Sequence, residues 1–125
     1  MMNFRGIRLT MLLAGMFLVS GIASAGEKKL MHCFFYSPIA NASQADWDAF
    51  YKATDELPGM IPGLSKVWVG KLRRPYLERE HGVCMEMDNE DALKTYSSHP
   101  AHDAWVKVYE KVRQPGTTTF DIIGR

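Results

Sequence analysis

The pattern of apolar positions opens with a short aromatic run that predicts a strand over Leu30–Tyr36 (LMHCFFY). Successive side chains of a strand point to opposite faces, and here both faces are largely apolar. A strand that is apolar on both sides is covered on both sides. One face carries Leu30, His32, Phe34 and Tyr36, and the other carries Met31, Cys33 and Phe35.

A helical period follows and predicts a helix over Ser43–Leu57. Ser43 is a good N-cap, and Asp46 stands three residues later, where an acid can return a hydrogen bond to the cap. The pair Pro58-Gly59 predicts the end of the helix. Trp47, Phe50, Thr54 and Leu57 fall on one helical face.

Strand-like and helix-like segments alternate over the rest of the chain. After the turn Ile61-Pro62-Gly63, strands are predicted over Leu64–Leu72, His81–Met87 and, after the break Gln114-Pro115-Gly116, over β-branched Thr117–Ile123. Arg73–Glu80 is predicted as a polar connection. A helix capped by Asp88 or Asn89 runs through Tyr96 and breaks near His99, because Pro100 cannot continue it. Since proline is favoured in the first turn of a helix, a new helix starts there and runs to about Val112.

The resulting order, β-α-β-β-α-α-β, predicts an α+β fold of the ferredoxin-like kind. It has one four-stranded antiparallel sheet with helices on one face. The chain supplies no further helix for the other face. A second copy of the chain is the economical cover, so that two sheets close face to face as a dimeric α/β barrel.

The segment Met1–Ala25 has the three-part pattern of a secretory signal peptide. Met1–Arg8 carries two arginines and no acid, Leu9–Ile22 is apolar, and Ala23-Ser24-Ala25 supplies small residues for cleavage near Ala25-Gly26. The alternative is an uncleaved membrane anchor. Residues 29–125 then form one domain, and an extracytoplasmic location, secreted or periplasmic, is expected.

Composition adds little beyond excluding some classes. The chain of 125 residues is 46% hydrophobic and 23% charged, which excludes collagen, coiled coil and wholesale disorder. Of its 15 basic and 14 acidic residues, only Arg5 and Arg8 lie in the leader, so the remainder has one acid in excess. No nucleic-acid surface is predicted, and no membrane contact after cleavage.

Cys33 and Cys84 are the only cysteines. In an oxidising compartment they can pair. Their neighbours indicate strand interiors, where a free cysteine behaves as a small apolar residue. Both states stay open at this point.

Three sequence elements resemble the stress-responsive A/B barrel family of the dimeric α+β barrel superfamily. They are His32 in the first strand, Ile61-Pro62-Gly63 followed by Val67–Lys71, and above all the segment Tyr96–His102 (YSSHPAH). The resemblance covers about residues 29 to 123 and implies a ferredoxin-like protomer and a homodimer. Some related barrels are enzymes on small, mostly apolar carbonyl or aromatic compounds, including a polyketide cyclase.

The resemblance places acid–base chemistry on Tyr96 and His102, with His32 on the pocket floor. Position supports this for His102, because the first turn of a helix disfavours an imidazolium and leaves a neutral base. A phenol such as Tyr96 can orient or protonate a substrate oxygen. The alternatives are a histidine that only packs under the helix, a core tyrosine, and a buried histidine satisfied by one hydrogen bond.

Further residues are candidates for supporting roles. Asp121 stands where an acid can fix a histidine tautomer, or it pairs with a lysine. His81 lines the pocket mouth or is exposed. The predicted pocket walls are Phe34, Tyr36, Phe50, Thr54, Val83, Met85 and Trp105. A metal site on His32, His99 and His102 is disfavoured, because a proline separates the last two and no carboxylate is close in sequence. No cofactor motif is present, and no cofactor is expected.

Two functions remain in competition. In the first, an exported dimer binds a small apolar carbonyl or aromatic compound and, if it is an enzyme, transforms it by acid–base chemistry in a cyclase-, lyase- or isomerase-like reaction. In the second, the protein is a structural or stress-response dimer without turnover, and its histidines only brace the helix break. A small pocket favours the second.

Overall fold

A computed structural model describes residues 27–125. Its elements follow the predicted order: β1 (Leu30–Tyr36), α1 (Gln44–Met60), β2 (Leu64–Tyr76), β3 (Arg79–Met87), α2 (Glu90–Ser98), α3 (Pro100–Tyr109) and β4 (Thr118–Ile123). The predicted signal peptide lies outside the described residues. Within residues 27–125, no helix is long and apolar enough to cross a membrane.

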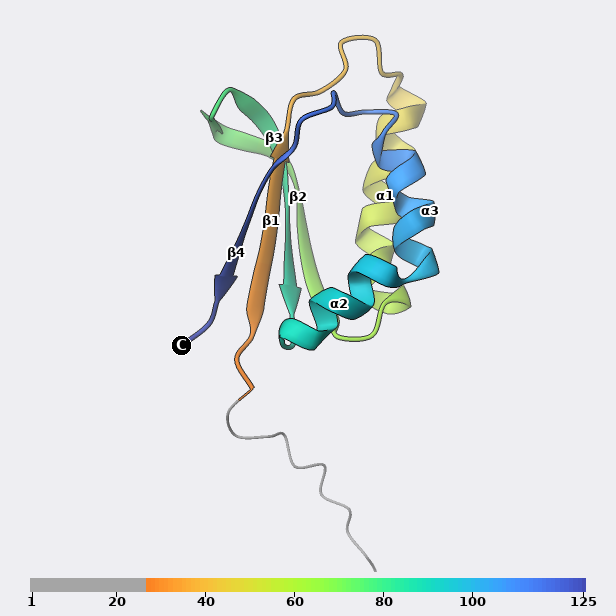
Figure 1. The fold of residues 1–125 in the computed structure, drawn as a ribbon. Helices are drawn as coiled ribbons and strands as arrows, with labels where there is room; N and C mark the ends of the chain where they lie inside the picture. Colours follow the sequence, from red (N-terminus) through yellow and green to blue (C-terminus); the bar gives the residue numbers. More distant parts are fainter. Residues whose placement is uncertain (1–26) are drawn as a thin grey trace, which may run out of the picture.

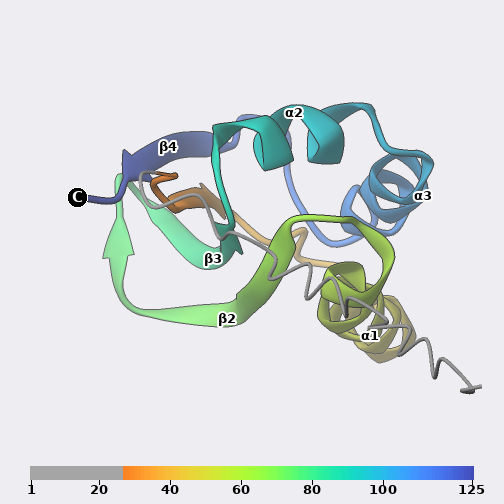
Figure 2. The ribbon, with the colours of Figure 1, turned by 90° about the horizontal axis from the view of Figure 1, so that it is seen from below.

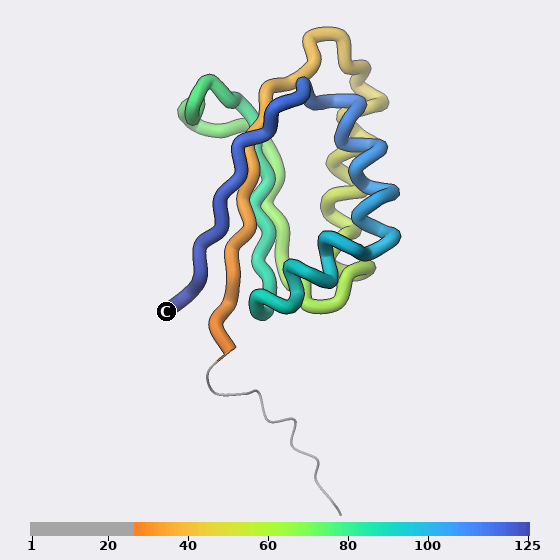
Figure 3. Tube along the Cα trace, viewed as in Figure 1, coloured from red at the N-terminus to blue at the C-terminus, as the bar shows by residue number. Residues whose placement is uncertain are grey.

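The four strands form one antiparallel sheet in the order β2-β3-β1-β4. All three helices lie on one face of this sheet, so the domain has two layers (Figure 1, Figure 2). The first and last strands of the chain run side by side in opposite directions (Figure 3). This is the predicted α+β, ferredoxin-like protomer.

The core lies between the sheet and the helices, where the predicted strand faces meet the predicted helix faces. Alternate residues of β1 and β3 point into it, and a buried helix face supplies the other side. Its fully enclosed members include Tyr36, Phe50, Leu57, Val83, Met85 and Met87.

Capping explains where α1 begins. The helix ends later than predicted because Pro58 removes only one of its hydrogen bonds. The Asp46 N–H donates to Ser43 Oγ at 3.1 Å, and Asp46 Oδ2 accepts from the Ser43 N–H at 3.3 Å. The helix then continues through Pro58 to Met60, so the predicted end at Leu57 was wrong. Pro58 lacks an N–H, which removes only one bond in the last turn. The Ile61 N–H still donates to the Leu57 carbonyl at 3.0 Å.

The predicted polar connection over residues 73–80 is instead a hairpin. Strand β2 extends to Tyr76, which pairs with Arg79 across a two-residue turn of Leu77 and Glu78. Pro75 is tolerated because β2 is an edge strand. The φ angles of Leu77 and Glu78 are 45° and 62°. The sequence did not predict this hairpin, because the segment is polar and its turn lacks the Asn-Gly pair that usually accompanies such angles.

The opposite face of the sheet is called here the open face; it is formed by Met31, Cys33, Phe35, Trp68, Phe120 and Ile122. Trp68, Phe120 and Ile122 are 46%, 38% and 56% exposed. Phe35 packs between Tyr76 and Phe120 at ring-centroid distances of 5.5 and 5.4 Å. The second apolar face of β1 predicted from the sequence therefore exists, and no helix of residues 27–125 covers it.

A disulfide joins Cys33 and Cys84 on the open face. The two residues stand directly opposite each other in β1 and β3, with Cα atoms 4.1 Å apart. Of the two states that the sequence left open, the structure has the bonded one.

The hairpin turn generates the first prediction. A left-handed conformation costs a non-glycine residue roughly 1–2 kcal/mol, and Leu77 and Glu78 both adopt it on an exposed turn. The double substitution Leu77→Asn with Glu78→Gly is expected to raise the free energy of unfolding by about 1 kcal/mol. Urea denaturation followed by circular dichroism measures this, and a lower midpoint than wild type would contradict the turn geometry.

Candidate functional site

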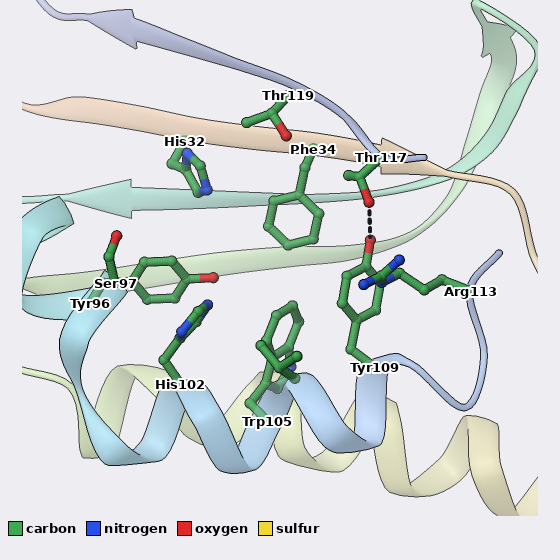
Figure 4. A pocket seen from close by; sticks show the side chains of 11 residues that line it. His32, Phe34, Tyr96, Ser97, His102, Trp105, Tyr109, Arg113, Thr117 and Thr119 are labelled. Atoms are coloured by element: carbon green, nitrogen blue, oxygen red, sulfur yellow. Dashed lines mark hydrogen bonds between the residues drawn. The ribbon is translucent and has the colours of Figure 1, made fainter. Parts of the chain in front are cut away.

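A cavity of about 280 Å³ lies between the sheet and helices α2 and α3. Strands β1 and β4 line one side of it, and the two helices line the opposite side (Figure 4). Its walls combine aromatic rings with a few polar groups. The lining residues are His32, Phe34, Tyr96, Ser97, His102, Trp105, Val106, Tyr109, Arg113, Thr117 and Thr119.

The break between α2 and α3 positions two of the polar groups. His99 ends α2 and caps α3, and its Nδ1 accepts from the Ala101 N–H at 3.0 Å. Pro100 starts α3, as the sequence predicted. The break turns the last turn of α2 toward the first turn of α3, so the rings of Tyr96 and His102 meet edge to face with centroids 4.5 Å apart.

The sheet supplies the third polar group, His32, through cross-strand pairing. His32 in β1 stands opposite Asp121 in β4, and its Nδ1 lies 2.6 Å from Asp121 Oδ1. A carboxylate accepts hydrogen bonds, so Nδ1 of His32 donates to Asp121 and Nε2 is the ring nitrogen left for a ligand. Nε2 faces the cavity (Figure 4). Asp121 thus orients the His32 ring in the cavity.

Burial sets the protonation states of the other two groups. It lowers the pKa of His102 below its usual 6.5; the nearby His32 acts in the same direction, and Asp103 acts against it. Burial raises the pKa of Tyr96 far above its usual 10. At neutral pH, His102 is therefore a neutral base and Tyr96 a protonated donor. The Tyr96 hydroxyl points between the two histidines (Figure 4).

Comparison with known proteins agrees with the fold. The family model described as "Stress responsive A/B Barrel Domain" (Dabb) matches residues 30–123. The chain belongs to the Dabb family. Among curated protein sequences, none matches it.

Solved structures share the Dabb fold at low identity. A dimeric ferredoxin-like protein of unknown function from Bacteroides fragilis is 22% identical, with a TM-score of 0.62 over 76% of this chain and 95% of that one. The hydroxynitrile lyase of Passiflora edulis is 14% identical, with a TM-score of 0.66 over 78% and 94%. SnoaB, a cofactor-independent oxygenase of Streptomyces nogalater, is 9% identical, with a TM-score of 0.56 over 78% and 92%. At these identities the likeness shows the fold alone.

The cavity brings together five of the residues singled out in the sequence: His32, Phe34, Tyr96, His102 and Trp105. Asp121 lies behind His32 and contacts it rather than lining the cavity.

Six other predicted site residues do not line this cavity. Helix α1 packs directly on the sheet there, which leaves no space for a ligand. Thr54 instead accepts from the Trp105 indole N–H at 2.9 Å and so holds that ring in place. His81 stacks between Tyr36 and Trp47 rather than standing at the mouth. The residues concerned are Tyr36, Phe50, Thr54, His81, Val83 and Met85.

Six residues that line the cavity were not predicted from the sequence. Two periodic signals contained most of them. Val106, Tyr109 and Arg113 follow His102 at helical spacings of four, seven and eleven. Thr117, Thr119 and Asp121 stand two residues apart, the spacing that places side chains on one face of a strand, and Thr117 directly precedes β4. Ser97, next to Tyr96, also lines the cavity.

A metal site was disfavoured from the sequence. Within residues 27–125, no three histidine, cysteine or acidic residues are grouped as a metal ion would require.

The lowered pKa of His102 generates a prediction about stability. As pH falls below about 7, the unfolded chain, whose histidines titrate near 6.5, takes up a proton before the folded one. The free energy of unfolding therefore decreases as the pH is lowered. We expect His102→Gln to lose less stability than wild type between pH 7.5 and 5.5, as measured by urea denaturation.

His81, whose pKa burial also lowers, provides the companion variant. His81→Gln is expected to remove a separate part of the same slope. A His102→Gln protein with the pH dependence of wild type would show that His102 is protonated equally readily in both states.

Proposed function

We propose that this protein binds a small carbonyl-bearing or aromatic compound in the cavity and moves protons on it. His102 acts as the general base and Tyr96 holds the substrate oxygen. The observation that carries this is the convergence of Tyr96, His102 and the Asp121-bound His32 on one aromatic-walled cavity. Enzymes of two kinds share the fold, which supports a catalytic use of this cavity.

The proton transfer follows from the protonation states. Neutral His102 takes a proton from the carbon beside the carbonyl, and the electron pair of that C–H bond forms an enolate. The hydroxyl of Tyr96 donates to the enolate oxygen as its charge develops. His32, held by Asp121, is a second polar contact for the substrate and can exchange protons with it. The cavity of about 280 Å³ lies just below the usual range for drug-sized ligands. This size favours the structural alternative named in the sequence analysis, and a substrate that fits the cavity must be small.

Exchange of carbon-bound hydrogen tests this function. The protein is incubated in D₂O with small aryl and alkyl ketones, and loss of the α-proton signal is followed by NMR. His102→Gln is expected to slow exchange about a hundredfold or more, and Tyr96→Phe about tenfold or more. His81→Gln, a histidine outside the cavity, is the matched control and keeps the wild-type rate.

A stress-response dimer without turnover predicts a different result. Exchange would equal the buffer background for every ketone, and neither cavity variant would change it. That outcome would refute the catalytic proposal and leave the structural function.

We also propose that the protein forms a homodimer through the open face. Its large apolar side chains Phe120, Trp68 and Ile122 are 38%, 46% and 56% exposed. Such exposure on one continuous face is costly in water without a partner. The B. fragilis structure with this fold is described as dimeric, in support.

Neighbouring isoleucines of β4 provide a matched test of the dimer. Ile122 pairs with Met31 on the open face, whereas Ile123 pairs with Leu30 on the helix side. Their exposed fractions are similar, at 56% and 53%. Ile122→Lys is expected to elute as a monomer in size exclusion with light scattering, and Ile123→Lys as a dimer. A monomeric wild type at high concentration would refute the proposal.

Export is part of the proposal. The leader pattern of residues 1–25 and the Cys33–Cys84 disulfide both support an oxidising compartment outside the cytoplasm, secreted or periplasmic. In the exported fraction, we expect the protein to have the smaller mass of a chain that begins near Gly26.

A further inference from the structure

The cavity has two chemically different ends (Figure 4). His32, Tyr96 and His102 stand at one end, and Tyr109, Arg113 and Thr117 stand at the other. The rings of Phe34 and Trp105 lie between them and leave a flat apolar middle. The proposed function uses only the first end.

Arg113 at the second end has donors to spare. Its guanidinium lies over the Tyr109 ring, 4.8 Å from the centroid, and its side chain makes no hydrogen bond to another residue of the described range 27–125. Its Nε is buried without a partner. The carboxylate of Glu110 is 3.8 Å from one terminal nitrogen, but the Glu110 side chain is 59% exposed. That pair is therefore weak.

The hydroxyls around Arg113 are also free to bind a ligand. Tyr109 and Thr117 share one contact of 3.5 Å, which is the limit of a hydrogen bond. Burial raises the pKa of Tyr109, so its hydroxyl keeps its proton. Two hydroxyls and a guanidinium at one end of a cavity form a set of donors without a strong acceptor.

Charge along the cavity orients a ligand. Asp121 lies behind His32 at the first end. At the second end, Arg79 lies beside the loop that carries Thr117, and one of its terminal nitrogens is 3.2 Å from the point where a Cβ on Gly116 would stand. Another donates to Ser37 Oγ at 3.4 Å, and its Nε, like that of Arg113, is buried without a partner. An anion is therefore attracted to the Arg113 end and repelled from the Asp121 end.

We infer that Arg113, with the hydroxyls of Tyr109 and Thr117, binds a carboxylate, and that the ligand is a small oxo acid with a flat apolar middle. Its carboxylate lies at Arg113 and its carbonyl at Tyr96 and His102. A guanidinium matches a carboxylate with two parallel hydrogen bonds, which makes this end selective for an acid over a neutral compound of the same shape. The assignment of the carbonyl end rests on the proposed function, whereas the carboxylate end does not.

A matched pair of ligands tests the carboxylate end. Binding of 4-acetylbenzoate and of its neutral amide, 4-acetylbenzamide, is measured by isothermal titration calorimetry at pH 7.5. Wild type is expected to bind the acid about ten- to a hundredfold more tightly, as charge-assisted hydrogen bonds provide. Arg113→Met is expected to remove this preference, because it weakens binding of the acid much more than binding of the amide, whose carbonyl forms only a neutral hydrogen bond with a guanidinium. Arg73→Met, an exposed arginine of β2, is the matched control and keeps it.

The other outcomes each decide the question. Equal binding of acid and amide by wild type, or an equal loss of both in Arg113→Met, would overturn the carboxylate site. If Arg113→Met does not fold, Arg113→Lys replaces it, and the acid preference of wild type is also measured at low and high salt. An acid preference that salt leaves unchanged also overturns the inference.

Proton exchange separates this inference from the proposed function. Acid binding that depends on Arg113, without exchange at the acetyl group, leaves the carboxylate site standing and removes the catalysis. Exchange on neutral ketones without any acid preference does the reverse.

Discussion

Strand β1 is the constraint on which the rest of this molecule depends, because it is apolar on both faces and lies inside the sheet. Its helix side contributes Phe34 to the core and His32 to the cavity. Its open side contributes Cys33 and Phe35 to a surface that no helix of residues 27–125 covers. Pairing with β4 on one edge also brings Asp121 to His32. One strand therefore serves the core, the cavity and the exposed face.

The cavity exists because the helices cover the sheet unevenly. Helix α1 packs closely against the half of the sheet that holds Val83 and Met85, and those side chains are fully enclosed. Over β1 and β4, where α2 and α3 meet at the break, the cavity remains between the helices and the sheet. The indole of Trp105, tied to Thr54 at 2.9 Å, forms the wall between the closely packed half and the cavity. Polar groups are retained next to this space, where a ligand can satisfy them.

The two ends of the cavity suit different parts of one small molecule. Neutral His102 and protonated Tyr96 suit a carbonyl group, where charge develops on oxygen during proton transfer. The guanidinium of Arg113 suits a fixed negative charge. Binding energy gained at the second end can hold the reacting carbon against the base at the first, which is how remote contacts accelerate a reaction.

Local signals in the sequence determined the order of the elements, the cap at Ser43 and the break at Pro100, because each depends on a few adjacent residues. Period-two alternation also identified both apolar faces of β1. Tertiary structure alone decided which residues of the helix-side face enclose a cavity: Phe34 lines it and Tyr36 does not, although they are two residues apart on one strand. Space between packed layers depends on how far a helix stands from the sheet, and no local pattern encodes that distance. The contact of His32 with Asp121 and the place of Arg113 depend likewise on pairing and packing between distant parts of the chain.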